Sequence, residues 1–412
     1  MIRSFLVTAS LTLCWALSPD VLVLLGNSIG QGGTFFFAAL FLGAAFSAMA
    51  ANILHYPFRS PVGDNRRDIL SSQIGPFLAM TLTLAGRLSP VLLISTGVLV
   101  TAGYTFNETF VYWFPNFGFS FFLLFVVLVL HLCGDKVVLA AQPVFFCITA
   151  CCLLFLSIAG LVTEPPVAQP VNVPIETAPN FFLSSICLSL LIFLGYDQRT
   201  LPQSAVDRPY FLTAIGIGLL LLVVWGLASL KHIPQAGLAE STVPYVIAAK
   251  AILGQTGRII MGIAIISGAC GAVSGLYYLS GRSLSQVLPG FASSRVQAVF
   301  MTVAIALFLA GGLAGSNHLE IYIFGALLLW LVTIGANCLA IARAKQFLHG
   351  YAIGVLLLAA AAYLAFIFPH PRPLGRLCLL VLAASTSFSA VWCGFGRKKR
   401  NLAFVNSKGD MV

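Results

Sequence analysis

Apolar residues run through this chain in long, nearly unbroken stretches that short polar or proline- and glycine-marked segments separate. A helix that spans a bilayer needs about 20 mostly apolar residues, and twelve stretches are of about this length. We therefore predict an all-α integral membrane protein with about twelve transmembrane helices. The predicted spans are residues 5–29, 32–54, 75–105, 116–133, 137–162, 179–203, 210–230, 257–281, 294–315, 319–343, 349–369 and 373–395.

The composition supports a membrane protein over a soluble one. Of the 412 residues, 59% are hydrophobic and only 8% are charged, and the mean hydropathy is +0.99. Values of this kind are typical of polytopic membrane proteins. Arg3 precedes the first apolar stretch, but no small-residue cleavage site follows it, so we expect this segment to be a retained helix and not a signal peptide.

The distribution of basic residues predicts the orientation, because Lys and Arg are retained on the cytoplasmic side. With a cytoplasmic N-terminus, sixteen of the 22 basic residues fall inside and five fall outside. The sixteen are Arg3, Arg59, Arg66, Arg67, Lys136, Arg199, Arg208, Arg282, Arg295, Arg343, Lys345, Arg397, Lys398, Lys399, Arg400 and Lys408, and the five are Lys231, Lys250, Arg258, Arg372 and Arg376. We predict a multi-pass protein of the cell membrane with both termini cytoplasmic.

The net charge of +10 has the same explanation, so we do not expect a nucleic-acid partner. Residues 397–412 form a predicted basic cytoplasmic tail, whose "RKKR" is typical of an anchor at the membrane surface.

Metal, cofactor and enzyme sites find no support in the sequence. The ten cysteines fall almost entirely within predicted spans, and none has metal-ligand spacing to a histidine. The six histidines lie singly at span ends or in loops, so no intramembrane histidine is expected to activate a serine. We predict no cofactor, no metal site and no enzymatic activity.

Three charged residues remain inside apolar spans, where such residues are functional candidates by default. They are Asp20, Arg87 and Asp197. Asp20 follows Ser18 and Pro19 in the middle of the first span, and Asp197 follows Gly195 and Tyr196 in the sixth. Transporters built from inverted repeats place an interrupted helix at corresponding positions of the two halves, with the substrate site between them.

The sixth-span sequence Phe193-Leu194-Gly195-Tyr196-Asp197 has the order aromatic, any residue, glycine, aromatic, acidic. The region "STVPYVIAAKAILGQTGRIIMGIAIISGACGAVSGLYYLSGRSLSQVLPG" has the layout of an external loop helix from Pro244 to Gly254 followed by a transmembrane helix. On these residues the chain resembles the amino acid, polyamine and organocation (APC) transporter superfamily. The resemblance implies a LeuT-like fold, a 5+5 inverted repeat with discontinuous helices 1 and 6 plus two C-terminal helices.

The resemblance also implies a division of the chain. The transporter domain would cover residues 1–396, with repeat one at about 5–162, repeat two at about 179–343 and the appended helices at about 349–395.

The resemblance further implies that the two helix breaks bind substrate, with backbone N–H groups receiving a carboxylate and carbonyls holding an amine. The positions that correspond in this chain are Ser18, Asp20, Val21, Phe193, Leu194, Gly195 and Tyr196. Asp20 departs from the family pattern, because a fixed carboxylate at the anion-binding helix end repels a substrate carboxylate.

Two interpretations of Asp20 stay open. In the first, Asp20 is the counter-ion of a substrate amine or a coupling cation. In the second, Ser18, Pro19 and Asp20 are the N-cap, N1 and N2 residues of the outer half-helix.

Asp197 and Arg87 are candidates for coupling or gating. Asp197 has the structural alternatives of an ion pair with Arg199 or a helix cap near Thr200. Arg87 is a potential partner of Asp197 or Asp20, but we favour the alternative in which its side chain snorkels to the cytoplasm.

These features predict a secondary active transporter for a small amino acid or organic amine that works by alternating access. We expect proton coupling or exchange, and rank sodium below them because no acidic residue accompanies the serines of the eighth span. The alternative is a non-transporting sensor of the same fold. The sequence leaves the oligomeric state open.

Overall fold

The computed structural model describes residues 2–55, 66–165, 179–197, 207–287, 293–311 and 319–409. Side chains are described within these ranges except at residues 66–68, 179–180, 207–209, 286–287 and 395–409. Arg59, Arg199 and Thr200 therefore lie outside the described residues, as do the side chains of the basic tail.

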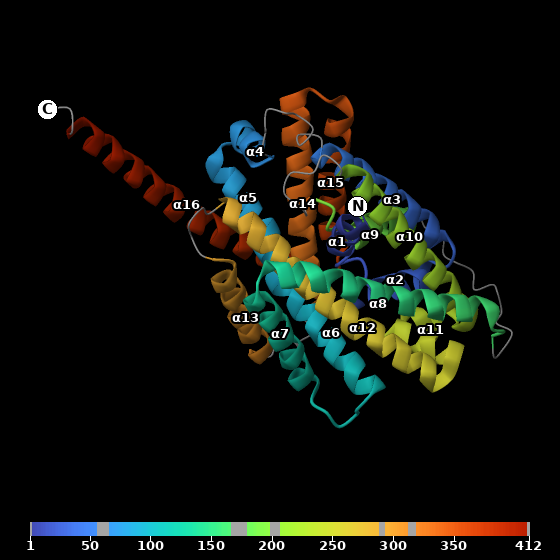
Figure 1. Ribbon diagram of the computed structural model, residues 1–412. Coiled ribbons are helices and arrows are strands. Elements are labelled where there is room, and N and C mark those ends of the chain that lie inside the picture. The colour runs from blue at the N-terminus through green and yellow to red at the C-terminus, as the bar shows by residue number, and fades with distance from the viewer. Residues whose placement is uncertain are drawn as a thin grey trace.

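The described residues form helices without any strand (Figure 1). In chain order the helices are α1 Ile2–Thr12, α2 Pro19–Gly32, α3 Phe35–Leu54, α4 Arg66–Ile74, α5 Pro76–Ser89, the π-helix η2 Pro90–Ile94, α6 Ser95–Thr109, α7 Asn116–Cys133, α8 Asp135–Val162, α9 Pro179–Ile192, α10 Asp207–His232, α11 Gln235–Ala239, α12 Pro244–Val287, α13 Ser294–Ala310, α14 Leu319–Lys345, α15 Leu348–Ile367 and α16 Pro371–Gly409.

The predicted multi-helix membrane fold is confirmed. Among the described residues, nine helical segments are long and apolar enough to cross a membrane, and three shorter apolar helices accompany them. The short ones are Ile2–Thr12, Phe181–Ile192 and Ser294–Ala310, which belong to the predicted first, sixth and ninth spans. The boundaries of the two repeats stay a prediction.

The first span is interrupted, as its sequence predicts. Helix α1 ends at Thr12, and α2 begins at Pro19 after the N-cap residue Ser18, whose hydroxyl accepts a hydrogen bond from the backbone N–H of Val21 at 3.4 Å. Proline suits a first helical position because its missing N–H is not needed there. The cap geometry expected for Ser18, Pro19 and Asp20 is thus confirmed.

The sixth span is interrupted as well. Helix α9 ends at Ile192, and residues 193–197 form turns in which Gly195 has a φ of +120°. A Cβ atom on residue 195 would lie 2.8 Å from the carbonyl oxygen of Thr12, which is too close for any other residue type. Glycine therefore allows the two breaks to touch.

The third span differs from the predicted 75–105, whereas the loop helix expected before the eighth span is confirmed. In the third, the π-helix η2 separates α5 from α6 at Pro90, which lacks the N–H that an α-helical hydrogen bond requires, and the helix continues to Thr109. In the eighth, the chain leaves helical geometry at Leu253 and Gly254, so α12 consists of a first helix that begins at Pro244 and ends where the sequence predicts, followed by the transmembrane helix.

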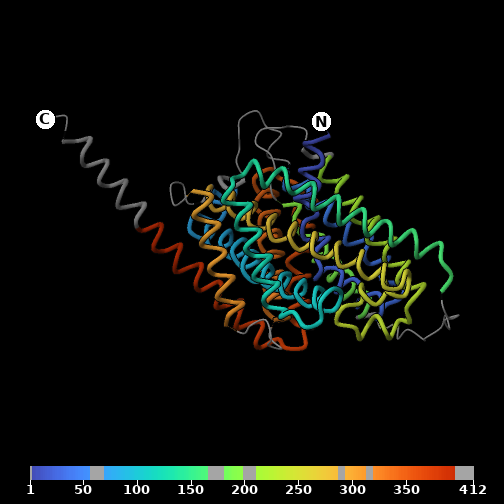
Figure 2. Tube along the Cα trace, turned by 60° about the horizontal axis from the view of Figure 1, so that its bottom comes forward, coloured from blue at the N-terminus to red at the C-terminus, as the bar shows by residue number. Residues whose placement is uncertain are grey.

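A single large hydrophobic core joins most of the helices and includes the residues of both breaks. Helices α8 and α12 pack along one another, and α12 also packs against α6 (Figure 2). Helix α9 packs against α3, and α11 covers α2. These contacts place both breaks inside the bundle.

Candidate functional site

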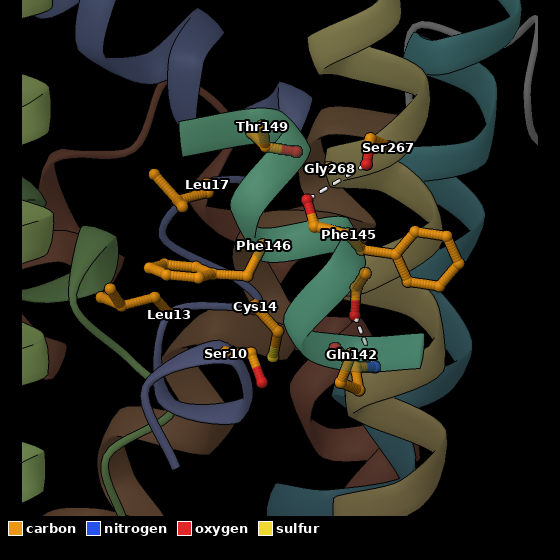
Figure 3. Close-up of a pocket in the computed structure, with 11 residues that line it drawn as sticks. Ser10, Leu13, Cys14, Leu17, Gln142, Phe145, Phe146, Thr149, Ser267 and Gly268 are labelled. Atoms are coloured by element: carbon orange, nitrogen blue, oxygen red, sulfur yellow. Dashed lines mark hydrogen bonds between the residues drawn. The ribbon is translucent and has the colours of Figure 1, made fainter. Parts of the chain in front are cut away.

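A small cavity lies against the first-span break (Figure 3). It is lined by residues of the break and α1, of α8 and of α12: Ser10, Leu13, Cys14, Leu17, Gln142, Phe145, Phe146, Thr149, Ser267, Gly268 and Gly271. The space open to the centre of a water-sized sphere is about 10 Å³, which is room for about one water molecule.

Two polar side chains of this cavity already donate hydrogen bonds to backbone carbonyl oxygens. The Gln142 Nε2 atom donates to the Gly271 carbonyl at 3.1 Å, and the Ser267 hydroxyl donates to the Phe145 carbonyl at 3.1 Å. No carboxylate is among the lining residues. The cavity therefore offers hydroxyl and carbonyl oxygens in a neutral surrounding.

Asp20 lies on the first turn of α2 and faces α6. Its Oδ1 atom accepts a hydrogen bond from the Thr101 hydroxyl at 2.5 Å. Its Oδ2 atom is buried and has no hydrogen-bond partner among the described residues. A Cβ atom on residue 97 would lie 3.1 Å from this oxygen, so Gly97 of α6 leaves the carboxylate its space.

This arrangement keeps both interpretations of Asp20 compatible. A carboxylate in the first turn of a helix is stabilised by the helix dipole and free N–H groups. That effect does not satisfy the second oxygen, and an unmatched buried polar atom is costly. The free oxygen is where a cation or a proton would act.

Asp197 is held by two donors from different helices. Its Oδ2 atom forms a salt bridge with Arg87 of α5, and its Oδ1 atom accepts from the Trp330 indole of α14 at 3.2 Å. The side chains of Arg87 and Asp197 are only 7% and 1% exposed. The favoured snorkelling position of Arg87 is therefore wrong, because a buried carboxylate partner compensates its charge inside the bundle.

The residue before Asp197 is fixed as well. The Nε2 atom of His55, at the end of α3, lies 2.8 Å from the Tyr196 carbonyl oxygen, and its ring stacks on Phe211 at 4.1 Å. Ser280 of α12 donates to the Arg87 carbonyl at 3.1 Å. The end of the sixth-span break is thus tied to α3, α5 and α14, and α5 is tied to α12.

Of the seven predicted substrate-binding residues at the two breaks, Asp20 is partly exposed. Ser18, Val21, Phe193, Leu194 and Tyr196 are buried, and none of them lines the cavity of Figure 3. The Trp15 side chain fills part of this region, and its indole Nε1 donates to the Leu191 carbonyl at 2.8 Å. The sequence analysis missed Trp15, because a tryptophan in an apolar stretch carries no signal for this contact.

A second polar contact that the sequence analysis missed joins α7 to α12. His131 and Ser274 are both buried, and the Nε2 atom of the histidine lies 3.4 Å from the serine hydroxyl. His131 lies at a span end, as predicted, and its side chain points inward from the last turn of α7. A contact of this length is weak.

Comparison with solved structures identifies the fold. The chain is similar to a manganese transporter from Eremococcus coleocola, with 11% identity, a TM-score of 0.57 and coverage of 95% of this chain and 93% of the transporter. It is also similar to a Na+-coupled sialic acid symporter, with 10% identity, a TM-score of 0.58 and coverage of 88% and 90%. No family model and no curated protein sequence matches the chain. At these identities the likeness shows a transporter fold.

Proposed function

We propose that this protein is a secondary active transporter that moves a small organic amine or amino acid across the cell membrane by alternating access, with both termini in the cytoplasm. The transporter fold supports transport in general. The observation that carries the substrate class is the unmatched Oδ2 atom of Asp20, which is buried at the helix break.

An ammonium group is the ligand that best suits this oxygen. A buried carboxylate is stable when an opposite charge or a hydrogen-bond donor meets it, and Thr101 supplies only one donor. An ammonium group brings both a positive charge and three donors. A substrate carboxylate in the same place would be repelled, so we propose that the amine is recognised first.

A metal ion as cargo has less support from the geometry. Within the described ranges, no group of three or more His, Cys, Asp or Glu side chains comes together. A single carboxylate oxygen is a poor site for manganese, which prefers several oxygen ligands.

For energy coupling we propose proton coupling or exchange rather than sodium coupling. The charge of Asp197 is compensated by Arg87. Of the two carboxyl groups described at the breaks, Asp20 is therefore the one that we propose carries a proton. The one-water cavity is lined without a carboxylate, and Gln142 already donates to one of its carbonyls. A sodium ion would find no negative charge there.

Thermal stabilisation of the detergent-solubilised protein tests the substrate class, because a ligand that binds only the folded state raises its stability. Leucine and isoamylamine are a matched pair, since they differ only by the carboxylate. We expect isoamylamine to stabilise the wild type and to lose this effect in Asp20→Asn.

The control variant is Asp135→Asn, because Asp135 also lies in the first turn of a helix but is exposed. This variant should respond to isoamylamine as the wild type does. Stabilisation by leucine alone, unchanged in Asp20→Asn, would contradict the proposal.

A further inference from the structure

Trp15 occupies the space between the two helix breaks. It belongs to the non-helical segment between α1 and α2, and its side chain is 1% exposed. Its indole N–H reaches across to the Leu191 carbonyl at 2.8 Å. This bond joins two segments that are 176 positions apart in the chain.

The Leu191 carbonyl is an unusual acceptor, because it belongs to the last turn of α9. The last four carbonyls of a helix have no partner within it, and they carry the negative end of the helix dipole. In an interrupted transmembrane helix such carbonyls face the interior, where an N–H donor or a cation is the favourable partner. In this conformation the Trp15 indole is that partner.

The cavity of Figure 3 does not extend to the Leu191 carbonyl. The cavity of Figure 3 is lined by Leu13, Cys14 and Leu17 of the break, but not by Trp15, and it has room for about one water molecule. A small amine of several heavy atoms does not fit there. An amine that binds the Leu191 carbonyl must therefore displace the Trp15 indole, which donates to that oxygen in this conformation.

We propose that the Trp15 indole is an internal plug of the substrate site, which must leave the Leu191 carbonyl before an amine binds there. This inference rests on the proposed function, and it adds a residue that sets access and substrate size. The ammonium group then takes over the hydrogen bond that the indole N–H makes in the closed state. The alternative is that Trp15 is a permanent part of the core that caps α9.

Hydrogen exchange of the indole N–H groups separates these two cases without any ligand. The chain has five tryptophans, so a protein labelled with 15N-tryptophan gives five indole signals, which Trp→Phe variants assign. Trp330 of α14 is the comparison, because it lies in the same core, is 1% exposed and has an indole N–H that also donates a hydrogen bond, to Asp197 at 3.2 Å. A plug opens repeatedly, so we expect the Trp15 N–H to exchange at least about tenfold faster than that of Trp330. Equal or slower exchange would overturn the proposal.

The Trp15→Phe variant tests competition with an amine. Phenylalanine keeps most of the bulk but cannot donate to Leu191, so the closed state loses one net hydrogen bond. The binding-competent fraction then rises, and the apparent affinity for isoamylamine should increase about fivefold. Trp225→Phe, in the same core on α10, should leave it unchanged. An unchanged or weaker affinity in Trp15→Phe would mean that the indole does not compete with the amine, and would also overturn the proposal.

The two arms keep this inference distinct from the proposed function. If isoamylamine binds no variant, the amine proposal fails, while the exchange measurement still decides whether Trp15 leaves its position. If isoamylamine binds and Trp15 stays protected, the amine proposal stands without the plug.

Discussion

The buried ion pair between Arg87 and Asp197 makes a quantitative prediction. Both side chains are nearly inaccessible, at 7% and 1% exposure. Removing one partner leaves the other as an uncompensated buried charge, and such changes cost about 3–5 kcal/mol. Asp197→Asn should lie at the lower end of this range, because the asparagine oxygen still accepts the Trp330 bond. Arg87→Met should lie at the upper end, since it leaves a full carboxylate charge with one neutral donor.

The double variant Arg87→Met/Asp197→Asn gives the decisive comparison. It removes both charges, so it should cost at least about 3 kcal/mol less than the sum of the two single changes. The free energy of unfolding is measured by SDS titration in mixed micelles for all four proteins. Single changes that cost about 1 kcal/mol or less, or a double variant equal to the sum, would refute the buried pair.

A control comes from the more exposed pair between Arg258 and Glu108, whose charged atoms are 3.8 Å apart and whose side chains are 23% and 52% exposed. Solvent screens such a pair, so Glu108→Gln should cost no more than about 1 kcal/mol. A cost as large as that of Asp197→Asn would mean that the assay reports a general effect of lost charge.

Three further changes test the local geometry. Ser18→Ala removes the cap of α2 and should cost about 1 kcal/mol in SDS titration, while Ser18→Thr should cost less; equal losses would argue against the cap. Gly195→Ala places a Cβ 2.8 Å from the Thr12 carbonyl at a φ of +120° and should cost about 1–3 kcal/mol, so a neutral effect in the same titration would show that the breaks do not touch. Thr101→Val removes the donor to Asp20 and should change isoamylamine affinity in a binding assay, with Thr101→Ser restoring it; a Ser variant that behaves like Val would contradict the hydroxyl contact.

Both helix breaks were predictable from the sequence because local chemistry produces them. Ser18 and Pro19 favour a helix start through their local geometry, and Gly195 permits a backbone conformation that other residues avoid. The long apolar stretches likewise specify membrane helices through their length alone. These features need no information about distant parts of the chain.

The contacts that fix the site depend on residues far apart in the chain and were not predictable in the same way. Arg87 and Asp197 are 110 positions apart, and Trp15 and Leu191 are 176 positions apart. From the sequence alone, a snorkelling side chain was a physically reasonable alternative for Arg87. Only the packing of α5 against α14 excludes this alternative. The π-helix at Pro90 also depends on packing, because a proline within a helix is compatible with a kink, a break or a bulge.

The central claim is that the carboxylate of Asp20 recognises a transported amine. The most direct test is uptake of radiolabelled isoamylamine into proteoliposomes with and without a pH gradient, for the wild type, Asp20→Asn and Asp135→Asn. The account predicts uptake that the gradient drives in the wild type and in Asp135→Asn and that is lost in Asp20→Asn, with the same amount of folded protein in the vesicles. Uptake by Asp20→Asn at the wild-type rate would contradict it.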